Sequence, residues 1–225
     1  MSQIRTNKHI TRTQVVVAKL REKILSGELG AGEALRQSAL ADSLNVSRIP
    51  LREALVQLEA EGLVKFEAHK GASVAPLSAK QVTELFELRA LIETDLLSKA
   101  IRNMTDAVIA QAESHLSDLE NAFEDSQAIS TWSKLNTQFH TCLYQAANRP
   151  HTLEMVKGLN TNCDRYIRLH LLLLGSIPRA AHDHRELLEY CRQRNAEKAT
   201  ALLKTHILDA ADSIREMVTQ QQVEI

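Results

Sequence analysis

The sequence contains few residues that would interrupt a helix or build a disulfide framework. Its 225 residues include only four prolines, seven glycines and 4% aromatics, whereas residues that favour helices, such as Leu, Ala, Glu and Lys, are abundant. The three cysteines, Cys142, Cys163 and Cys191, lie far apart and form no C-x-x-C pair. Neither a set of disulfides nor a cysteine-based zinc site is therefore indicated, and the composition predicts a mostly α protein.

Long apolar segments are also missing. No run approaches the roughly 18 apolar residues that a membrane-spanning helix requires, and the first residues, MSQIRTNKHITRTQ, lack the apolar stretch of a secretory signal. We therefore expect a cytoplasmic protein without a membrane partner. With 44% hydrophobic content, the chain is long enough for one large domain or two ordinary ones.

Charge is nearly balanced overall but unevenly distributed along the chain. The formal net charge is −1, yet the segment through residue 75 holds 11 Lys and Arg against 8 Asp and Glu, and the remainder holds 16 against 20. A difference of a few charges is a weak indication, because many proteins that never bind nucleic acid show it. It does direct attention to the first 75 residues.

Helical patterns open this segment. Val16, Leu20 and Ile24 are spaced by four, which predicts one apolar helical face. The following GELGAG, residues 27–32, could cradle a phosphate, but it lacks the G-x-G-x-x-G order and follows a helix rather than a strand. We interpret it as a turn, followed by a short helix around QSALADSL.

A third helix is predicted to begin at Ser47 or Arg48. Ser47 is suited to accept hydrogen bonds from the free amides of a first helical turn, and Pro50 is tolerated there because those nitrogens lack intrahelical partners. Leu51, Leu55 and Leu58 recur at helical spacing. Their side of the helix should face the core.

Arg48 and Arg52 share another face of this helix, one turn apart. Like charges at that spacing repel each other, so the pair makes more sense if it meets an anion. The second helix of a helix-turn-helix presents its N-terminal residues to the DNA major groove, where arginine can bind guanine through two hydrogen bonds. The alternative is a solvated surface pair without a ligand.

A β-hairpin is predicted directly after this helix. Apolar and polar residues alternate through VKFEA, residues 64–68, and again through ASV, residues 72–74, on either side of a turn at 69–71. A hairpin in this position forms the wing of a winged helix. Lys70 and Gly71 at its tip suit a phosphate or minor-groove contact, because lysine attracts the anion and glycine allows close approach.

The stretch GAGEALRQSALADSLNVSRIPLREALVQLEAEGLVKFEAHKGASV resembles the winged-helix DNA-binding domain of the GntR family of bacterial transcription regulators. The motifs VSR-x-P-x-REAL and L-x-x-EGLV, and a wing ending in G-x-x-V, carry the resemblance over about 45 residues. It implies that operator DNA is contacted by Arg36, Ser47, Arg48, Arg52, Lys70 and Gly71, with Arg36 and Ser47 on phosphates.

Beyond Pro76 no strand pattern appears. Ser78 and Gln81 form a potential capping box at the start of a long helix through about Ile101. Further helices are expected near 106–124, 130–147, 151–173, 179–192 and 196–221, with breaks at 103–105, 125–126, 148–150, 175–178 and 195. The sequence thus predicts an N-terminal winged helix-turn-helix with a small β-hairpin, residues 1–76, and a C-terminal all-α six-helix bundle, residues 77–225.

Three histidines of the predicted bundle are candidate metal ligands. Asn136 and His140 share one face beside an apolar stripe, whereas His184 and His206 belong to the last two helices. Three imidazoles and one oxygen that converge inside a bundle would suit Zn²⁺ or Ni²⁺. Each histidine taken alone is more often a hydrogen-bonded core or surface group.

The order and spacing of these residues resemble the FCD type of ligand-binding domain, which accompanies one GntR subfamily. The resemblance implies a divalent metal bound by Asn136, His140, His184 and His206, with His182 as a nearby substitute for His184. Asparagine stands where the family has Asp or Asn, and an amide brings no negative charge. We therefore expect weaker metal binding than at an aspartate site, and a more positive pocket.

Arg89 lies within an apolar helical face, where a buried guanidinium requires a partner. Glu93, four residues on, could supply it. The family resemblance implies another role, in which Arg89 and the metal hold the carboxylate of a small organic-acid effector. Arg165 and Arg168 are further candidates for effector binding.

These features together predict a homodimeric, metal-dependent transcription factor, a repressor, that responds to a small carboxylate. One alternative is a metal-dependent hydrolase with an accessory DNA-binding domain, since a metal held by histidines can activate water. No H-E-x-x-H motif supports that alternative. Another is a constitutive DNA-binding protein without an effector.

Overall fold

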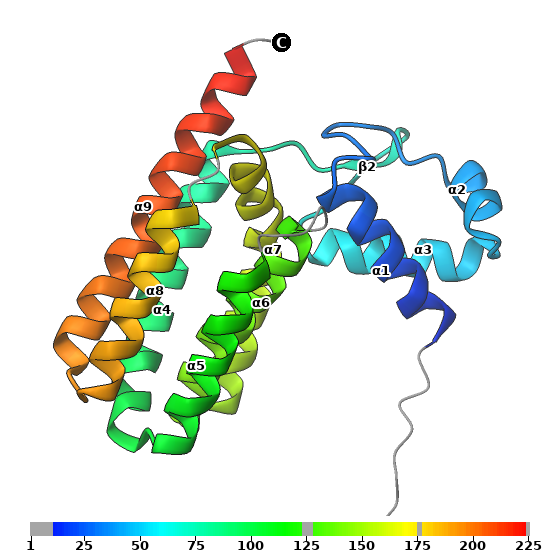
Figure 1. Cartoon of the computed structure of the whole chain (residues 1–225). Helices are drawn as coiled ribbons and strands as arrows, with labels where there is room; N and C mark the ends of the chain where they lie inside the picture. The colour runs from blue at the N-terminus through cyan, green and yellow to red at the C-terminus, as the bar shows by residue number, and fades with distance from the viewer. Residues whose placement is uncertain (1–10, 123–127, 175–176, 224–225) are drawn as a thin grey trace, which may run out of the picture. The chain divides into compact units, whose positions relative to one another are not determined.

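The computed structural model describes residues 11–122, 128–174 and 177–223 (Figure 1). The chain divides between Pro76 and Leu77 into two compact units, Met1–Pro76 and Leu77–Ile225. Each unit has its own hydrophobic core. Among the described helices, none combines the length and apolarity needed to cross a membrane.

The N-terminal unit contains three helices and a hairpin. Their order is α1 (Arg12–Leu25), α2 (Gln37–Leu44), α3 (Arg48–Ala60), β1 (Val64–Glu67) and β2 (Gly71–Val74). Thr11 and Gln14 cap the start of α1 through a reciprocal pair of hydrogen bonds. Gly27 and Gly32 follow with φ of 81° and 77°, which glycine adopts without steric cost. The interpretation of residues 27–32 as a turn is confirmed.

The core of this unit forms between α1 and α3. Leu51, Leu55 and Leu58 of α3 are each 0% exposed, and Val16 and Leu20 of α1 belong to the same cluster. Burying one such leucine contributes about 1.5–3 kcal/mol. Because the core takes this side of α3, the opposite side of the helix remains in solvent.

The hairpin has the predicted antiparallel pairing, with Val64 opposite Val74. The first strand ends at Glu67, one residue earlier than expected, because the chain turns through residues 68–70. His69 in this turn has a φ of 66°. An isolated bridge joins Ala34 to Ser73 and adds a short third partner to the small sheet. The segment before α2 is thereby fixed to the wing.

The C-terminal unit is entirely helical within the described residues. Its helices are α4 (Ala79–Asn103), α5 (Asp106–Asn121), α6 (Ala128–Gln145), α7 (Pro150–Leu174), α8 (Ile177–Arg192) and α9 (Ala196–Val223). The predicted fold class, a winged helix followed by a six-helix bundle, is confirmed. Most expected bounds differ from these by one to three residues; the expected breaks at 125–126 and 175–176 lie outside the described residues.

The first and last helices of the bundle, α4 and α9, pack along each other (Figure 1). Ser78 caps α4 by accepting a hydrogen bond from the amide of Gln81 at 3.3 Å. The side chain of Gln81 instead accepts a hydrogen bond from Tyr166 Oη at 2.9 Å. Only half of the predicted capping box is therefore used, and the other half ties α4 to α7.

Candidate functional site

The N-terminal end of α3 exposes two arginines and one aliphatic residue. Arg48 and Arg52 are exposed, and Ile49 between them is 72% exposed, the most exposed of the large hydrophobic residues described. Ser47 occupies the N-cap position with φ −73° and ψ 165°, but its side chain makes no capping hydrogen bond. The predicted capping role of its hydroxyl is therefore wrong, and the exposed hydroxyl can meet another acceptor or donor.

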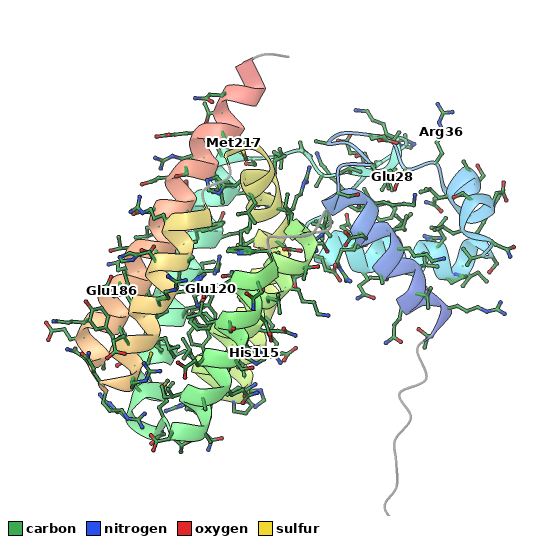
Figure 2. The ribbon with its side chains drawn as sticks, viewed as in Figure 1. Glu28, Arg36, His115, Glu120, Glu186 and Met217 are labelled. Atoms are coloured by element: carbon green, nitrogen blue, oxygen red, sulfur yellow. The ribbon has the colours of Figure 1, made fainter. Side chains whose placement is uncertain are left out.

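The N-terminal unit has two further exposed cations among the predicted DNA contacts. Arg36 precedes α2 and extends away from the ribbon in Figure 2. The side chain of Lys70 is 80% exposed at the wing tip and pairs with Glu67 at 3.0 Å. Hydrogen bonds from Lys70 and Lys65 lower the pKa of Glu67. A phosphate that binds Lys70 would have to compete with this surface ion pair, which is worth little in water.

Three histidines from three helices converge inside the C-terminal unit. His140 of α6, His184 of α8 and His206 of α9 each place a ring nitrogen within 4.8 Å of the other two. The Nε2 atoms of His140 and His184 are 3.2 Å apart. His140 and His184 are 2% and 0% exposed, so side chains that are 44 residues apart in the chain meet in the core.

Burial keeps two of these imidazoles neutral. Desolvation, followed by the nearby His206, holds the pKa of both His140 and His184 well below the usual 6.5. A neutral imidazole offers a lone pair to a cation, whereas an imidazolium offers none. His140 and His184 are thus in the protonation state that metal binding requires.

Two of the three histidines have a hydrogen-bond partner on Nδ1. His206 Nδ1 lies 3.0 Å from Asp183 Oδ2, and the hydrogen bond with His206 lowers the pKa of Asp183. His140 Nδ1 lies 3.4 Å from Tyr144 Oη. A metal-binding histidine commonly donates its second N–H in this way, which orients the ring.

A cavity of about 110 Å³ adjoins the histidines and is walled by five helices. Arg89, Asn136, His140, Asp183 and His206 provide polar groups in its wall. Apolar surface comes from Phe86, Trp132, Ile167, Leu171, Ala180, Ile207, Ala210 and Ile214. A space of this size admits on the order of ten water-sized groups, which is enough for an ion and a small organic molecule.

Arg89 is almost completely buried and forms the predicted pair with Glu93. Its Nε lies 2.7 Å from Glu93 Oε1, and the two side chains are 7% and 0% exposed. Burial alone would lower the pKa of Arg89, but the carboxylate of Glu93 outweighs it and raises the pKa. The guanidinium is a permanent positive charge at the cavity wall.

The donor set of the cluster fits a divalent cation. Two metal–nitrogen bonds of about 2.0–2.1 Å at a tetrahedral angle place their nitrogens about 3.3 Å apart, close to the 3.2 Å between His140 and His184. Asn136 Oδ1 is a buried oxygen for which the described residues provide no hydrogen-bond partner. A cation beside it would satisfy that oxygen and complete three nitrogens with one oxygen.

Two family models match this chain: bacterial regulatory proteins of the gntR family over residues 12–74, and the FCD domain over residues 84–209. The chain belongs to the GntR family. Because members of this family are DNA-binding transcriptional regulators, this protein is a regulator of that kind rather than an enzyme. The first match covers the winged helix and the second covers most of the bundle.

Similar proteins agree with this assignment. The HTH-type transcriptional repressor GlaR of Escherichia coli (strain K12) is 30% identical over 196 residues, which cover 84% of this chain and 89% of GlaR. The uncharacterized regulator YdhC of Bacillus subtilis (strain 168) is 28% identical over 193 residues, covering 84% and 83% of the two chains.

Solved structures resemble it as well. A GntR family member from Pseudomonas syringae pv. tomato shares 33% identity, with a TM-score of 0.58 and coverage of 94% of this chain and 88% of that one. McbR/YncC of E. coli has a TM-score of 0.75 at 20% identity, covering 95% and 99%, and shows the fold alone.

In this GntR family member, the predicted metal ligand His184 and its alternative His182 lie in different environments, and so do the three arginines predicted to bind the effector. His184 lies in the cluster, whereas the side chain of His182 is 77% exposed and lies 3.9 Å from Glu186. The described cavity wall includes Arg89 but neither Arg165 nor Arg168. Arg168 instead directs its Nε to Asp164 at 3.1 Å. The expectation that these two arginines reach the effector pocket is not supported by their placement.

Some residues of the site were missed by the sequence reasoning. Tyr144 lies four residues after His140, as His140 lies four after Asn136, so helical spacing could have indicated it. Asp183 stands beside His184 in the sequence but contacts His206, which only the packing of α8 on α9 reveals. Asp183 also brings to the site the negative charge that Asn136 lacks.

Proposed function

We propose that this regulator is an effector-controlled repressor in which a divalent metal, Zn²⁺ or Ni²⁺, and Arg89 hold the carboxylate of a small organic acid. The observation that carries the proposal is the convergence of His140, His184 and His206 beside a cavity with a buried guanidinium in its wall. Asn136 supplies the fourth ligand atom.

The effector is a small acid with an apolar body. Its carboxylate satisfies the metal and the guanidinium of Arg89 together, since charge-assisted bonds of this kind are the strong ones in a buried site. The rest of the molecule contacts the apolar wall around Trp132 and Phe86. The cavity volume of about 110 Å³ has room for a ligand of roughly ten non-hydrogen atoms when each takes the space of a water-sized group.

Operator DNA is read by the exposed side of α3 and by the wing. Arg48 and Arg52 contact guanines or phosphates in the major groove, and Ile49 between them meets the methyl group of a thymine. Arg36, Ser47, Lys70 and Gly71 contact the phosphate backbone. Two subunits of a homodimer bind the two half-sites of a short palindrome.

DNA binding is tested with duplex sites selected by the purified wild-type protein from a random-sequence library. Replacing Arg48 or Arg52 by alanine should weaken binding by about 1–3 kcal/mol if the residue reads a base. Lys70→Ala should weaken binding to all DNA sequences alike, and it should reduce the salt dependence of binding by about one phosphate contact. Lys19→Ala, an exposed cation on α1, is the control. Equal affinity of all four variants and the wild type would reject the proposed surface.

Metal binding is tested by elemental analysis of the purified protein and of two histidine variants. His140→Ala should lose the metal and the effector response while it keeps DNA binding. His182→Ala changes an exposed histidine two residues from His184 and should keep all three properties. Full metal occupancy in His140→Ala would refute the ligand set.

Effector control is tested by gel shift and thermal shift with a panel of mono- and dicarboxylates of two to six carbons. A ligand that binds the folded protein stabilises it by about 2.7 kcal/mol at a concentration of one hundred times its Kd, and it should release the duplex from a repressor. A constitutive DNA-binding protein would respond to no acid. Light scattering should give a mass of twice the 25.2 kDa of one chain.

A further inference from the structure

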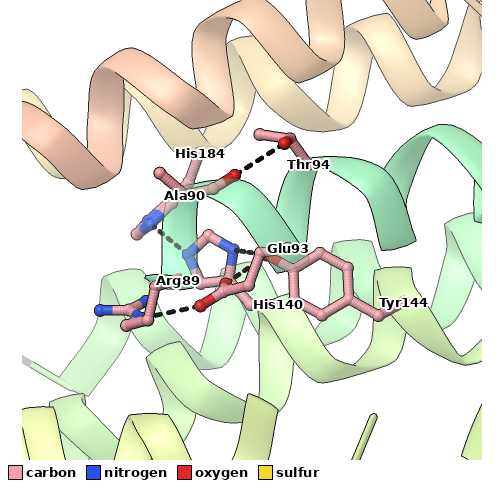
Figure 3. Close-up of polar contacts among 7 residues, drawn as sticks. All are labelled: Arg89, Ala90, Glu93, Thr94, His140, Tyr144 and His184. Carbon is pink, nitrogen blue, oxygen red and sulfur yellow. Dashed lines mark hydrogen bonds and ion pairs between the residues drawn. The ribbon is translucent and has the colours of Figure 1, made fainter. Parts of the chain in front are cut away.

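Tyr144 links the histidine cluster to a buried ion pair. The side chain is fully buried; its Oη donates a hydrogen bond to Glu93 Oε2 at 2.7 Å and lies 3.4 Å from His140 Nδ1. Glu93 receives the guanidinium of Arg89 on its other oxygen at 2.7 Å. Figure 3 shows the resulting chain of contacts, which runs from Arg89 through Glu93 and Tyr144 to the ring of His140.

Counting protons fixes the direction of each bond in this chain. The carboxylate of Glu93, paired with Arg89, can only accept. A phenol has one proton, and Tyr144 must donate it to Glu93, because the Oε2 atom 2.7 Å away can only accept. Since that proton points to Glu93, the oxygen of Tyr144 can only accept from His140. The Nδ1 atom of His140 must then carry a hydrogen.

We propose that the chain Arg89–Glu93–Tyr144 positions His140 in the tautomer with hydrogen on Nδ1, so that the lone pair of Nε2 faces the metal position. Tyr144 is thus a positioning residue that makes His140 ready to bind a cation before the cation arrives. The metal part of this inference rests on the proposed function, whereas the tautomer does not.

A second observation supports the same assignment from the other side of the cluster. His184 Nε2 lies 3.2 Å from His140 Nε2. If Nε2 of His140 has the lone pair in this contact, Nε2 of His184 must have the hydrogen. The Nδ1 of His184 then bears no hydrogen, in agreement with its lack of any hydrogen-bond partner among the described residues. The opposite tautomers would leave a buried N–H without an acceptor, which is costly.

The three histidines therefore differ in readiness. His140 is oriented by Tyr144, and His206 is oriented by Asp183, which accepts from its Nδ1. His184 alone has no such partner among the described residues, and for a metal to bind at its Nε2 the ring would have to change tautomer, with the hydrogen on Nδ1 instead of Nε2. We expect His140 and His206 to capture the ion and His184 to close the site.

The tautomers can be measured by NMR on the metal-free full-length protein labelled with ¹⁵N in its histidines. In the wild type, long-range proton–nitrogen spectra should show hydrogen on Nδ1 of His140 and on Nε2 of His184. Hydrogen on Nε2 of His140 would overturn the proposal. This measurement uses the wild type, so it does not depend on whether a variant folds. In Tyr144→Phe, the preference of His140 for the Nδ1 hydrogen should be lost.

Zn²⁺ affinity provides the second readout, by competition with a chromogenic chelator. Tyr144→Phe should weaken binding about 10- to 100-fold, the usual effect of removing an outer-shell partner. Tyr166→Phe is the matched control, because it removes a buried tyrosine hydroxyl of the same unit that bonds Gln81 and not the cluster. It should change the affinity less than about twofold.

The outcomes separate the two proposals. A wild type that binds neither Zn²⁺ nor Ni²⁺ would refute the metal site, while the tautomers would still decide the role of Tyr144. A wild type that binds Zn²⁺, with Tyr144→Phe and Tyr166→Phe both at wild-type affinity, would overturn the role of Tyr144 and leave the metal site standing.

Discussion

Removing the carboxylate of Glu93 should destabilise the C-terminal unit more than most single substitutions do. Glu93 is 0% exposed and Arg89 is 6% exposed, so Glu93→Ala leaves a desolvated guanidinium without its charge partner and Tyr144 without its acceptor. Breaking a buried ion pair from one side costs about 3–5 kcal/mol, and the lost tyrosine bond adds about 1 kcal/mol. We expect a total of about 4–6 kcal/mol, out of the 5–15 kcal/mol that is typical of a domain.

The fluorescence of Trp132 in a urea titration measures this loss. It is the only tryptophan of the chain, and it is buried in the bundle, so its emission reports unfolding of the C-terminal unit alone. Metal is removed with a chelator first, because a bound ion would add its own stabilisation. The titration compares wild type, Glu93→Ala and a double variant.

The double variant replaces Arg89 by Met and Glu93 by Leu. It removes both charges and keeps apolar volume, so it should be less destabilised than Glu93→Ala, as is usual when a buried pair is replaced as a whole. A loss below about 1 kcal/mol in Glu93→Ala would show that Arg89 is not desolvated and would refute the reasoning.

Three further results are expected. Burial, and to a smaller extent the nearby His206, keeps the pKa of His140 and His184 well below 6.5, so only the unfolded metal-free chain takes up these protons as the pH falls. The free energy of unfolding should therefore decrease below pH 6.5 by up to about 1.4 kcal/mol per pH unit for each histidine. A urea midpoint that is unchanged between pH 7 and 5.5 would contradict this expectation. Replacing the contacted thymine by deoxyuridine, which lacks the methyl group, should cost wild-type DNA binding roughly 1 kcal/mol and cost Ile49→Ala nothing more; additive losses would exclude the contact. Burial raises the pKa of Cys163 to about 11 and that of Cys191 to about 12. Neither thiol should therefore react with a disulfide reagent at pH 8 until urea unfolds the chain. Rapid reaction of these thiols in the folded protein would disprove their burial.

The sequence was sufficient for features that lie within one element or one short motif. The spacing of Leu51, Leu55 and Leu58 gives the core side of α3, and the alternation around residues 69–71 gives the hairpin, because both patterns follow from the periods of helix and strand. The pair Arg89–Glu93 was among the predicted alternatives for the same reason. Local geometry alone determines such contacts.

Contacts between distant helices were harder to predict. The convergence of His140, His184 and His206 followed from a family resemblance, since no spacing within one helix brings three helices together. Asp183 was missed because its partner is 23 residues away. The effector role of Arg165 and Arg168 stays a prediction: both are buried, but the described cavity wall includes neither, and Arg168 contacts Asp164.

The position of Arg89 along α4 has a mechanical consequence. The N-terminal unit ends at Pro76 and α4 begins at Ala79, so Arg89 lies ten residues, or about 15 Å, from the end of a continuous rod. If an effector bound at Arg89 tilts that rod, as the proposed function requires, the N-terminal end of α4 moves with it. A tilt of about 5° would displace the first turn of α4, and the linker joined to it, by about 1 Å.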